Sequence, residues 1–121
     1  MNAFGVIYEI FNLNLPLFNY NNKAMLRHIV MIKLKDNVDT SIVSKELKVM
    51  LENLEHSIEP LLKIEAGINI STKPSAYDVV LTADFNDVDG LDEYRVHPEH
   101  VKLLDYLKIV MEKAAVVDYF Y

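Results

Sequence analysis

The stretch of sequence that decides the fold is Leu-Arg-His-Ile-Val-Met-Ile-Lys-Leu, residues 26–34. Its even positions are apolar except for His28, whereas its odd positions place Ile29 and Met31 between two basic residues. A period of two is typical of a β-strand, because successive side chains point to opposite faces of a sheet. We therefore expect a strand with one face against helices and a second face that also needs cover at its centre.

The segments that follow alternate between helical and strand patterns. Asp39 or Thr40 can cap a helix that must end before Pro60. The apolar residues of this helix recur every three or four positions, at Val43, Leu47, Met50, Leu51 and Leu54. Residues 63–71 and 77–85 alternate apolar and polar side chains on either side of a turn, which predicts an antiparallel hairpin.

The last third of the chain predicts two more helices and a closing strand. Residues 87–95 have helical spacing, and Pro98 suits the first turn of a second helix. The expected apolar face of that helix is Val101, Leu104, Leu107 and Met111. Residues 116–121 are β-branched and aromatic, as in a strand.

The resulting order is β-α-β-β-α-β, which is the ferredoxin-like arrangement of the α+β class. Helices on one side of such a sheet leave its other face bare. A homodimer that packs two sheets together would cover that face, so we expect a homodimer.

The composition excludes several classes of partner and site. The 121 residues suit one domain, and 18 acidic against 12 basic residues give a net charge of −6. Because no basic cluster is present, we expect neither a nucleic-acid partner nor binding to an anionic membrane. The absence of cysteine excludes disulfides, thiolate catalysis and cysteine-ligated zinc.

Residues 1–24 are predicted to be an N-terminal extension to a domain that spans residues 25–121. The extension is apolar, but it has no positive charge before Lys23, which argues against a secretory signal. We therefore expect a cytoplasmic protein. Two interpretations of the extension stay open: an upstream start that precedes the domain, or an arm whose phenylalanines cover a sheet edge or the partner.

Four separate segments of the sequence resemble the stress-responsive dimeric α/β-barrel (Dabb) family. They are residues 26–34, Phe85 together with the acidic sequence Asp-Val-Asp at residues 87–89, the sequence Tyr-Arg-Val-His-Pro-Glu-His at residues 94–100, and residues 116–119. The resemblance implies a ferredoxin-like subunit, a dimer that forms an α/β barrel through the sheets, and a pocket between sheet and helices. It implies no single activity, because the family includes stress-induced proteins and also plant polyketide cyclases, which close rings without a metal or organic cofactor. We accordingly expect no cofactor.

His100 and Tyr94 are the candidate catalytic residues. His100 falls in the first turn of the helix that begins at Pro98, where the helix dipole and partial burial both favour a neutral imidazole. A neutral imidazole can act as a general base; the alternative is that His100 only bonds a nearby backbone or side chain. Tyr94 precedes the chain reversal, so its hydroxyl can come near His100 and donate to a developing enolate oxygen. The alternative is a boundary tyrosine with a hydrated hydroxyl.

The remaining polar residues near this sequence have structural interpretations. His97 is expected to cap the helix, and Pro98 to set the turn. His97 and His100 lack a third ligand, so we expect no metal site. Asp105 and Asp118 are interpreted as solvated or capping acids.

The expected pocket is lined by His28, Val30, Val79, Leu104 and Leu107. A histidine such as His28 on an apolar strand face is commonly a satisfied core residue, and the resemblance makes it a pocket residue. In polyketide cyclases a helix tyrosine and a strand histidine complete the pocket, whereas Leu51 and Val79 stand at the corresponding positions here.

These observations favour a homodimer that binds a small apolar molecule. The alternative is a cofactor-independent cyclase or lyase in which His100 is the base and Tyr94 stabilises the enol. A monooxygenase-like activity is a third possibility that rests on fold analogy alone.

Overall fold

A computed structural model describes residues 24–121 of the chain. The predictions for the N-terminal extension lie outside these residues. The described elements follow one another in the order β2 (Leu26–Leu34), α1 (Thr40–Asn53), η1 (Leu54–His56), β3 (Lys63–Ile68), β4 (Val79–Phe85), α2 (Val88–Val96), α3 (Pro98–Val110) and β5 (Met111–Phe120).

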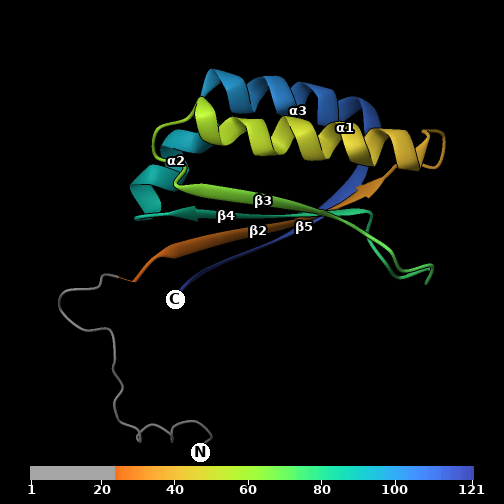
Figure 1. Cartoon of the computed structure of the whole chain (residues 1–121), viewed down its shortest axis with the longest axis horizontal. Coiled ribbons are helices and arrows are strands. Elements are labelled where there is room, and N and C mark those ends of the chain that lie inside the picture. Colours follow the sequence, from red (N-terminus) through yellow and green to blue (C-terminus); the bar gives the residue numbers. More distant parts are fainter. Residues whose placement is uncertain (1–23) are drawn as a thin grey trace, which may run out of the picture.

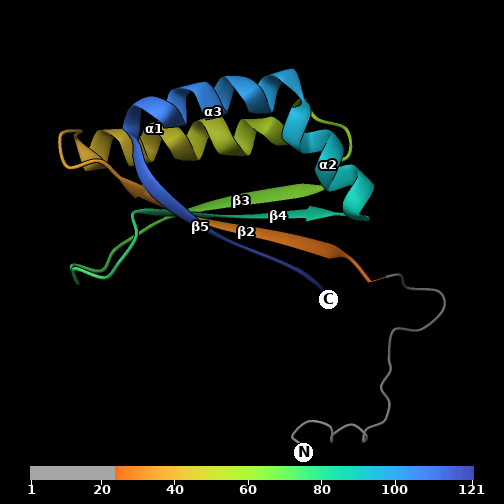
Figure 2. The same cartoon turned by 180° about the vertical axis from the view of Figure 1, so that it is seen from behind.

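The four strands form one antiparallel sheet in the order β3-β4-β2-β5. Helices α1 and α3 run side by side across one face of this sheet (Figure 1). Among residues 24–121, no helix lies on the opposite face, as the view from behind shows (Figure 2). This is the ferredoxin-like α+β fold that the sequence predicted, including the antiparallel hairpin of β3 and β4.

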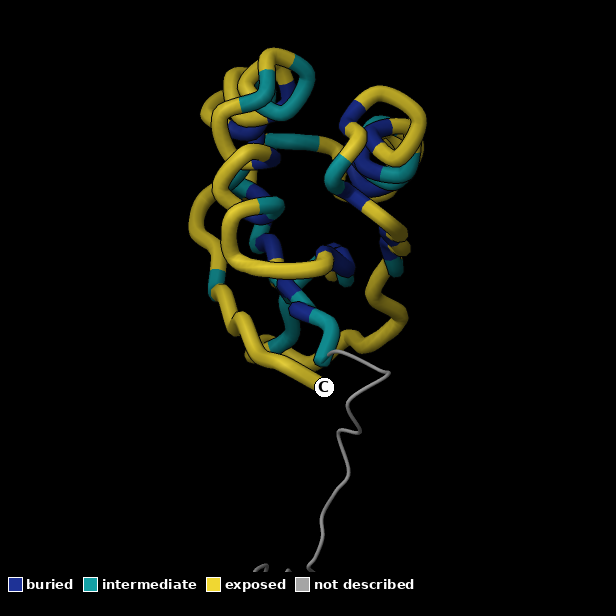
Figure 3. The backbone as a smooth tube through the Cα atoms, turned by 90° about the vertical axis from the view of Figure 1, so that its left-hand side faces the viewer, coloured by how far each residue is buried: buried dark blue, intermediate teal, exposed yellow. Residues whose placement is uncertain are grey.

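The hydrophobic core lies between the helices and the inner face of the sheet. The register places Val30 opposite Leu81 and Ile32 opposite Val79, so these four side chains share the inner face. Asp39 caps α1 by accepting the Ile42 amide hydrogen, and the buried stripe of this helix consists of Val43, Ser44, Leu47 and Leu51. The buried parts of both long helices lie toward the sheet (Figure 3). Burial of each large side chain there contributes about 1.5–3 kcal/mol.

The free edge of β3 is bound by side chains of the neighbouring helical segment. Glu55 accepts the Ile64 amide hydrogen at 2.9 Å, and Glu52 accepts that of Ala66 at 3.2 Å. Lys48 donates to the Ala66 carbonyl at 2.6 Å. These bonds occupy backbone groups that an edge strand otherwise offers to another chain.

The sequence predictions for the C-terminal elements are wrong in two respects. The face of α3 that is buried consists of Leu103, Leu107 and Val110, whereas Val101 and Leu104 are exposed. Two apolar stripes overlap at Leu107, and packing against the core selects the one that periodicity alone did not favour. Strand β5 begins at Met111, not at residue 116, because the backbone of Met111 is already extended (φ −94°, ψ 132°).

The outer face of the sheet carries an ion pair that makes stability depend on pH. Arg27 Nε donates to Asp84 Oδ1 at 2.9 Å and Arg27 Nη2 to Oδ2 at 3.0 Å. Asp84 is a buried residue, and this pairing lowers the pKa of its carboxyl group. A carboxyl group with a lowered folded-state pKa stabilises the fold above its unfolded pKa of about 3.9, and this contribution is lost as the pH falls below that value.

We predict that the urea midpoint of the wild-type chain falls more between pH 7 and about pH 3 than that of Asp84→Asn. The reason is that only the wild type has the Asp84 carboxylate, whose pKa is lowered in the folded state by Arg27. Asp105→Asn is the matched control, since Asp105 forms only an exposed pair with Lys108 at 3.5 Å. Its pH dependence should follow the wild type. Parallel curves for wild type and Asp84→Asn would contradict the prediction.

Candidate functional site

The site is built around the break between α2 and α3. In an uninterrupted helix the Tyr94 carbonyl would accept from the amide of residue 98, but Pro98 has no amide hydrogen. The Tyr94 carbonyl accepts from the His97 amide at 3.2 Å instead. His97 itself is extended (φ −63°, ψ 137°), and Pro98 occupies the first turn of α3. The structure therefore places His97 and Pro98 at the cap and turn positions expected for them.

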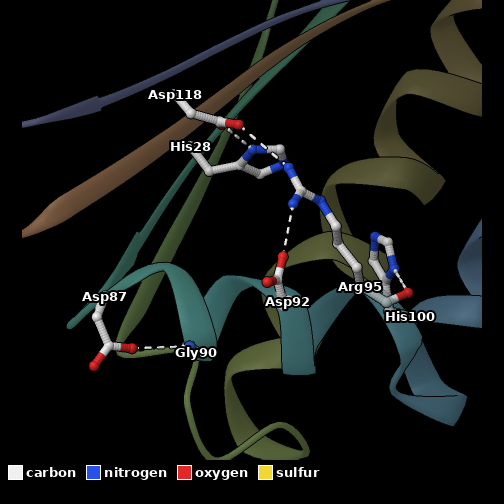
Figure 4. A network of polar contacts seen from close by, with 7 residues as sticks. All are labelled: His28, Asp87, Gly90, Asp92, Arg95, His100 and Asp118. Atoms are coloured by element: carbon white, nitrogen blue, oxygen red, sulfur yellow. Dashed lines mark hydrogen bonds and ion pairs between the residues drawn. The ribbon is translucent and has the colours of Figure 1, made fainter.

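The same break frees the Arg95 carbonyl for a side chain. The Glu99 amide, which would bond that carbonyl in a continuous helix, donates to His97 Nδ1 at 3.1 Å. The Arg95 carbonyl contacts His100 Nδ1 at 3.0 Å (Figure 4). Because a carbonyl can only accept, His100 Nδ1 carries the hydrogen and Nε2 keeps a free lone pair.

His100 is held in the form that can accept a proton. Burial lowers its pKa, and the charges of His28, Arg95 and His97 act in the same direction against the smaller opposing effect of the Arg95 carbonyl. The imidazole is therefore neutral at pH 7. The sequence analysis named both the helix dipole and partial burial as causes, and burial is the largest cause in the structure.

Tyr94 is a buried residue that contacts three aromatic side chains. Its ring centroid lies 4.3 Å from that of His100, 5.1 Å from that of Phe85 and 6.2 Å from that of His28. Burial raises the pKa of the Tyr94 phenol, so the hydroxyl keeps its hydrogen near neutral pH. The structure thus brings the two candidate catalytic residues into direct contact.

A second polar network joins the sheet to α2. His28 lies opposite Asp118 across β2 and β5, and its Nδ1 is 2.5 Å from Asp118 Oδ1. Arg95 donates to Asp118 Oδ2 at 3.2 Å and to Asp92 at 3.1 Å (Figure 4). Since a carboxylate can only accept, His28 carries a hydrogen on Nδ1.

Sequence reasoning missed this network. Asp118 is exposed, as the interpretation of a solvated acid expected, but that interpretation missed its pairing with His28 and Arg95. One signal could have found it: in the alternation of the last strand, Asp118 shares a face with Val116 and so interrupts an apolar surface. No sequence signal identified Arg95.

The two histidines and Tyr94 line one cavity of about 370 Å³ between α3 and the β2–β5 side of the sheet. Of the pocket residues expected from sequence, Val30, Leu104 and Leu107 also line it. The other lining residues are Ile32, Leu51, Leu81, Arg95, Leu103, Met111, Ala114 and Val116.

Val79 does not line this cavity. It borders a separate hollow that Met31 and Tyr77 share. Leu81 is opposite Val30 and Val79 is opposite Ile32, so both residues lie on the inner face of the sheet. Leu81 lines the cavity where Val79 was expected.

Within residues 24–121, no group of three or more His, Cys, Asp or Glu side chains is arranged to hold a metal ion. In the same described part of the chain, no helix is long and apolar enough to cross a membrane.

Comparisons with known proteins agree with the fold. A family model described as the stress responsive A/B barrel domain matches residues 26–121. An uncharacterised protein of Streptomyces coelicolor is 37% identical over 78 residues, which are 63% of this chain and 79% of that protein. Olivetolic acid cyclase of Cannabis sativa is 25% identical over 96 residues, which are 78% of this chain and 94% of the cyclase.

Among solved structures, a dimeric protein of unknown function with a ferredoxin-like fold, from Bacteroides fragilis, superposes with a TM-score of 0.73. It is 33% identical and the match covers 80% of this chain and 96% of that one.

We predict that His97→Ala lowers the free energy of unfolding by about 1 kcal/mol, because the Glu99 amide loses its cap. His97→Asn should retain most of the stability, since an asparagine oxygen can accept the same hydrogen bond. Urea unfolding at pH 7 measures both. Equal losses for the two variants would show that the cap is not what His97 contributes.

Proposed function

Because the chain belongs to the stress responsive A/B barrel domain family, we propose that it is a homodimer that binds a small apolar molecule in the cavity beside His100. The observation that carries the proposal is the cavity itself, about 370 Å³ and lined mainly by aliphatic side chains. Small-molecule sites typically have volumes of about 300–1,000 Å³, apolar walls and a few polar groups. Tyr94, Arg95 and the two histidines supply those polar groups at one end.

The outer face of the sheet supports the homodimer. Its central residues are apolar and exposed, and no helix in the described part of the chain covers them: Met31, Val80, Val117 and Tyr119. A second copy of the sheet would remove this surface from water, which is favourable. The dimeric Bacteroides fragilis structure, with the same fold, supports the same arrangement.

Three further expectations accompany the proposal. One of them is a cytoplasmic location. The absence of a nucleic-acid partner is supported by the net charge of −6. The absence of an organic cofactor is supported by the side-chain groups at the polar end, which can transfer protons themselves.

A second candidate function is proton abstraction next to a carbonyl, as in a cyclase or lyase. It is favoured by one observation, the contact between Tyr94 and His100 with a free Nε2 on the imidazole. Nε2 would take the proton, and the Tyr94 hydroxyl would donate to the oxygen of the resulting enolate. The similarity to olivetolic acid cyclase supports this chemistry, whereas Leu51 and Leu81 leave the far end of the cavity without polar groups.

We predict that light scattering gives twice the 13.9 kDa mass of one chain. Val117→Lys, which places a charge on the outer sheet face, should give a monomer. Val49→Lys is the matched control, because Val49 is similarly exposed but lies on α1, and it should stay dimeric. A monomeric wild type at micromolar concentration would overturn the homodimer.

We predict that the neutral fluorophore N-phenyl-1-naphthylamine binds with enhanced fluorescence and that Leu104→Trp reduces its affinity at least tenfold by filling the cavity. Val101→Trp is the matched control, since Val101 is as exposed as Leu104 on the same helix but does not line the cavity. Equal binding by both variants would show that the fluorophore binds elsewhere.

We predict that the wild type accelerates exchange of the α-hydrogens of 2-nonanone with deuterium oxide, followed by mass spectrometry. His100→Gln should abolish the acceleration, and Tyr94→Phe should reduce it. Because the pKa of His100 is lowered, the basic form persists below the usual histidine value of about 6.5, and the rate should fall only at more acidic pH. A wild type without acceleration would exclude the catalytic function and leave the binding function.

A further inference from the structure

We propose that Arg95 is the positioning residue of this site, because this single residue at the end of α2 holds both histidines of the cavity: His100 through its carbonyl and His28 through Asp118. Any effect of Arg95 on ligand binding or turnover rests on the proposed function. The geometry is a property of the unliganded protein and can be tested without a ligand.

The first connection fixes the tautomer of His100. The Arg95 carbonyl is available only because the Glu99 amide bonds His97. It contacts His100 Nδ1 at 3.0 Å, which directs the hydrogen to Nδ1 and leaves Nε2 as the basic nitrogen. Any residue at position 95 provides a carbonyl, so this connection depends on the backbone and not on the side chain.

The second connection depends on the guanidinium. Asp118 lies on an edge strand and its side chain is about a third exposed, so water competes for its oxygens. Arg95 binds Oδ2 and leaves Oδ1 facing His28. The other end of the guanidinium is bound by Asp92 at 3.1 Å. A planar group held at two points orients a carboxylate better than a lysine ammonium can.

The Arg95 side chain lines the cavity and connects two elements that border it. Among residues 24–121, the Arg95–Asp118 bond is the one side-chain hydrogen bond that links the helices to β5. Arg95, Tyr94 and both histidines line the cavity. Arg95 therefore links α2 to β5 at the polar end of the cavity, beside both imidazoles.

The charge of Arg95 also acts on His100. The groups near His100 are Tyr94 and Arg95 from α2, His28 from β2 with its partner Asp118 from β5, and His97 and Glu99 at the start of α3. Glu99 is paired with Lys102 at 3.0 Å. The positive charge of Arg95 lowers the pKa of His100, so removal of that charge should move the titration of His100 to higher pH.

The experiment is a histidine NMR study of the full chain in four forms: wild type, Arg95→Met, Arg95→Lys and Asp92→Asn. Long-range ¹H–¹⁵N spectra in alkaline buffer report the tautomer of each neutral imidazole, and a pH titration reports each midpoint. The exposed His56 is an internal reference. Thermal melts establish that each variant is folded.

In the wild type, His28 and His100 should both carry the hydrogen on Nδ1. Arg95→Met should raise the midpoint of His100 and convert His28 to a mixture of tautomers, while His100 keeps its tautomer. Arg95→Lys should restore the midpoint of His100 but not the tautomer of His28, because lysine restores the charge without the planar geometry. Asp92→Asn should resemble the wild type, since an asparagine oxygen can still accept the hydrogen bond from Arg95.

Unchanged spectra of both histidines in Arg95→Met would overturn the proposal. If that variant does not fold, Asp118→Asn provides the same test for His28, which should lose its single tautomer. None of these results depends on a ligand, so failure to bind the fluorophore or to exchange the ketone would remove the proposed function and leave the role of Arg95 standing.

Discussion

Proline has no amide hydrogen, and at position 98 this constraint organises the whole candidate site. The helix of Tyr94 cannot continue through Pro98, so the chain becomes extended at His97 and begins a new helix. His97 then captures the Glu99 amide, and the Arg95 carbonyl is left for His100. One missing donor thereby fixes which nitrogen of His100 is protonated. It also places Tyr94 and His100, which are six positions apart in sequence, in ring contact.

The cavity follows from the unequal way in which the helices cover the sheet. Helix α1 packs on the β3–β4 side, where Lys48, Glu52 and Glu55 also bind the edge of β3. Helix α3 buries Leu103, Leu107 and Val110 but does not pack closely on β5, whose residues remain largely exposed. The space between α3 and β5 is the cavity, and its walls are apolar because both elements turn aliphatic side chains toward it.

Each of the two candidate catalytic groups in the cavity has one defined role, as a hydrogen-bond donor or as an acceptor. The Tyr94 hydroxyl keeps its hydrogen because burial raises its pKa, and His100 stays neutral because burial lowers its pKa. Both effects follow from the cost of placing a charge in a poorly hydrated site. A phenol that donates beside an imidazole that accepts suits a carbonyl compound with an acidic neighbouring hydrogen. The same pair would equally orient a ligand that does not react, so one geometry suits both proposed functions.

The sequence by itself determined the order of the elements and the break before α3, because alternation, helical spacing and the chemistry of proline are local properties. It also placed His100 in the first turn and Tyr94 nearby. It could not choose the buried face of α3, since two apolar stripes meet at Leu107 and only packing separates them. It could not choose Leu81 over Val79, because both lie on the inner face of the sheet. It could not pair Asp118 with His28, because that pair depends on a strand register set by contacts between distant residues. The tertiary structure alone decided that Arg95 reaches from α2 to β5, because that contact requires two elements that are distant in sequence to fold close together at one end of the cavity.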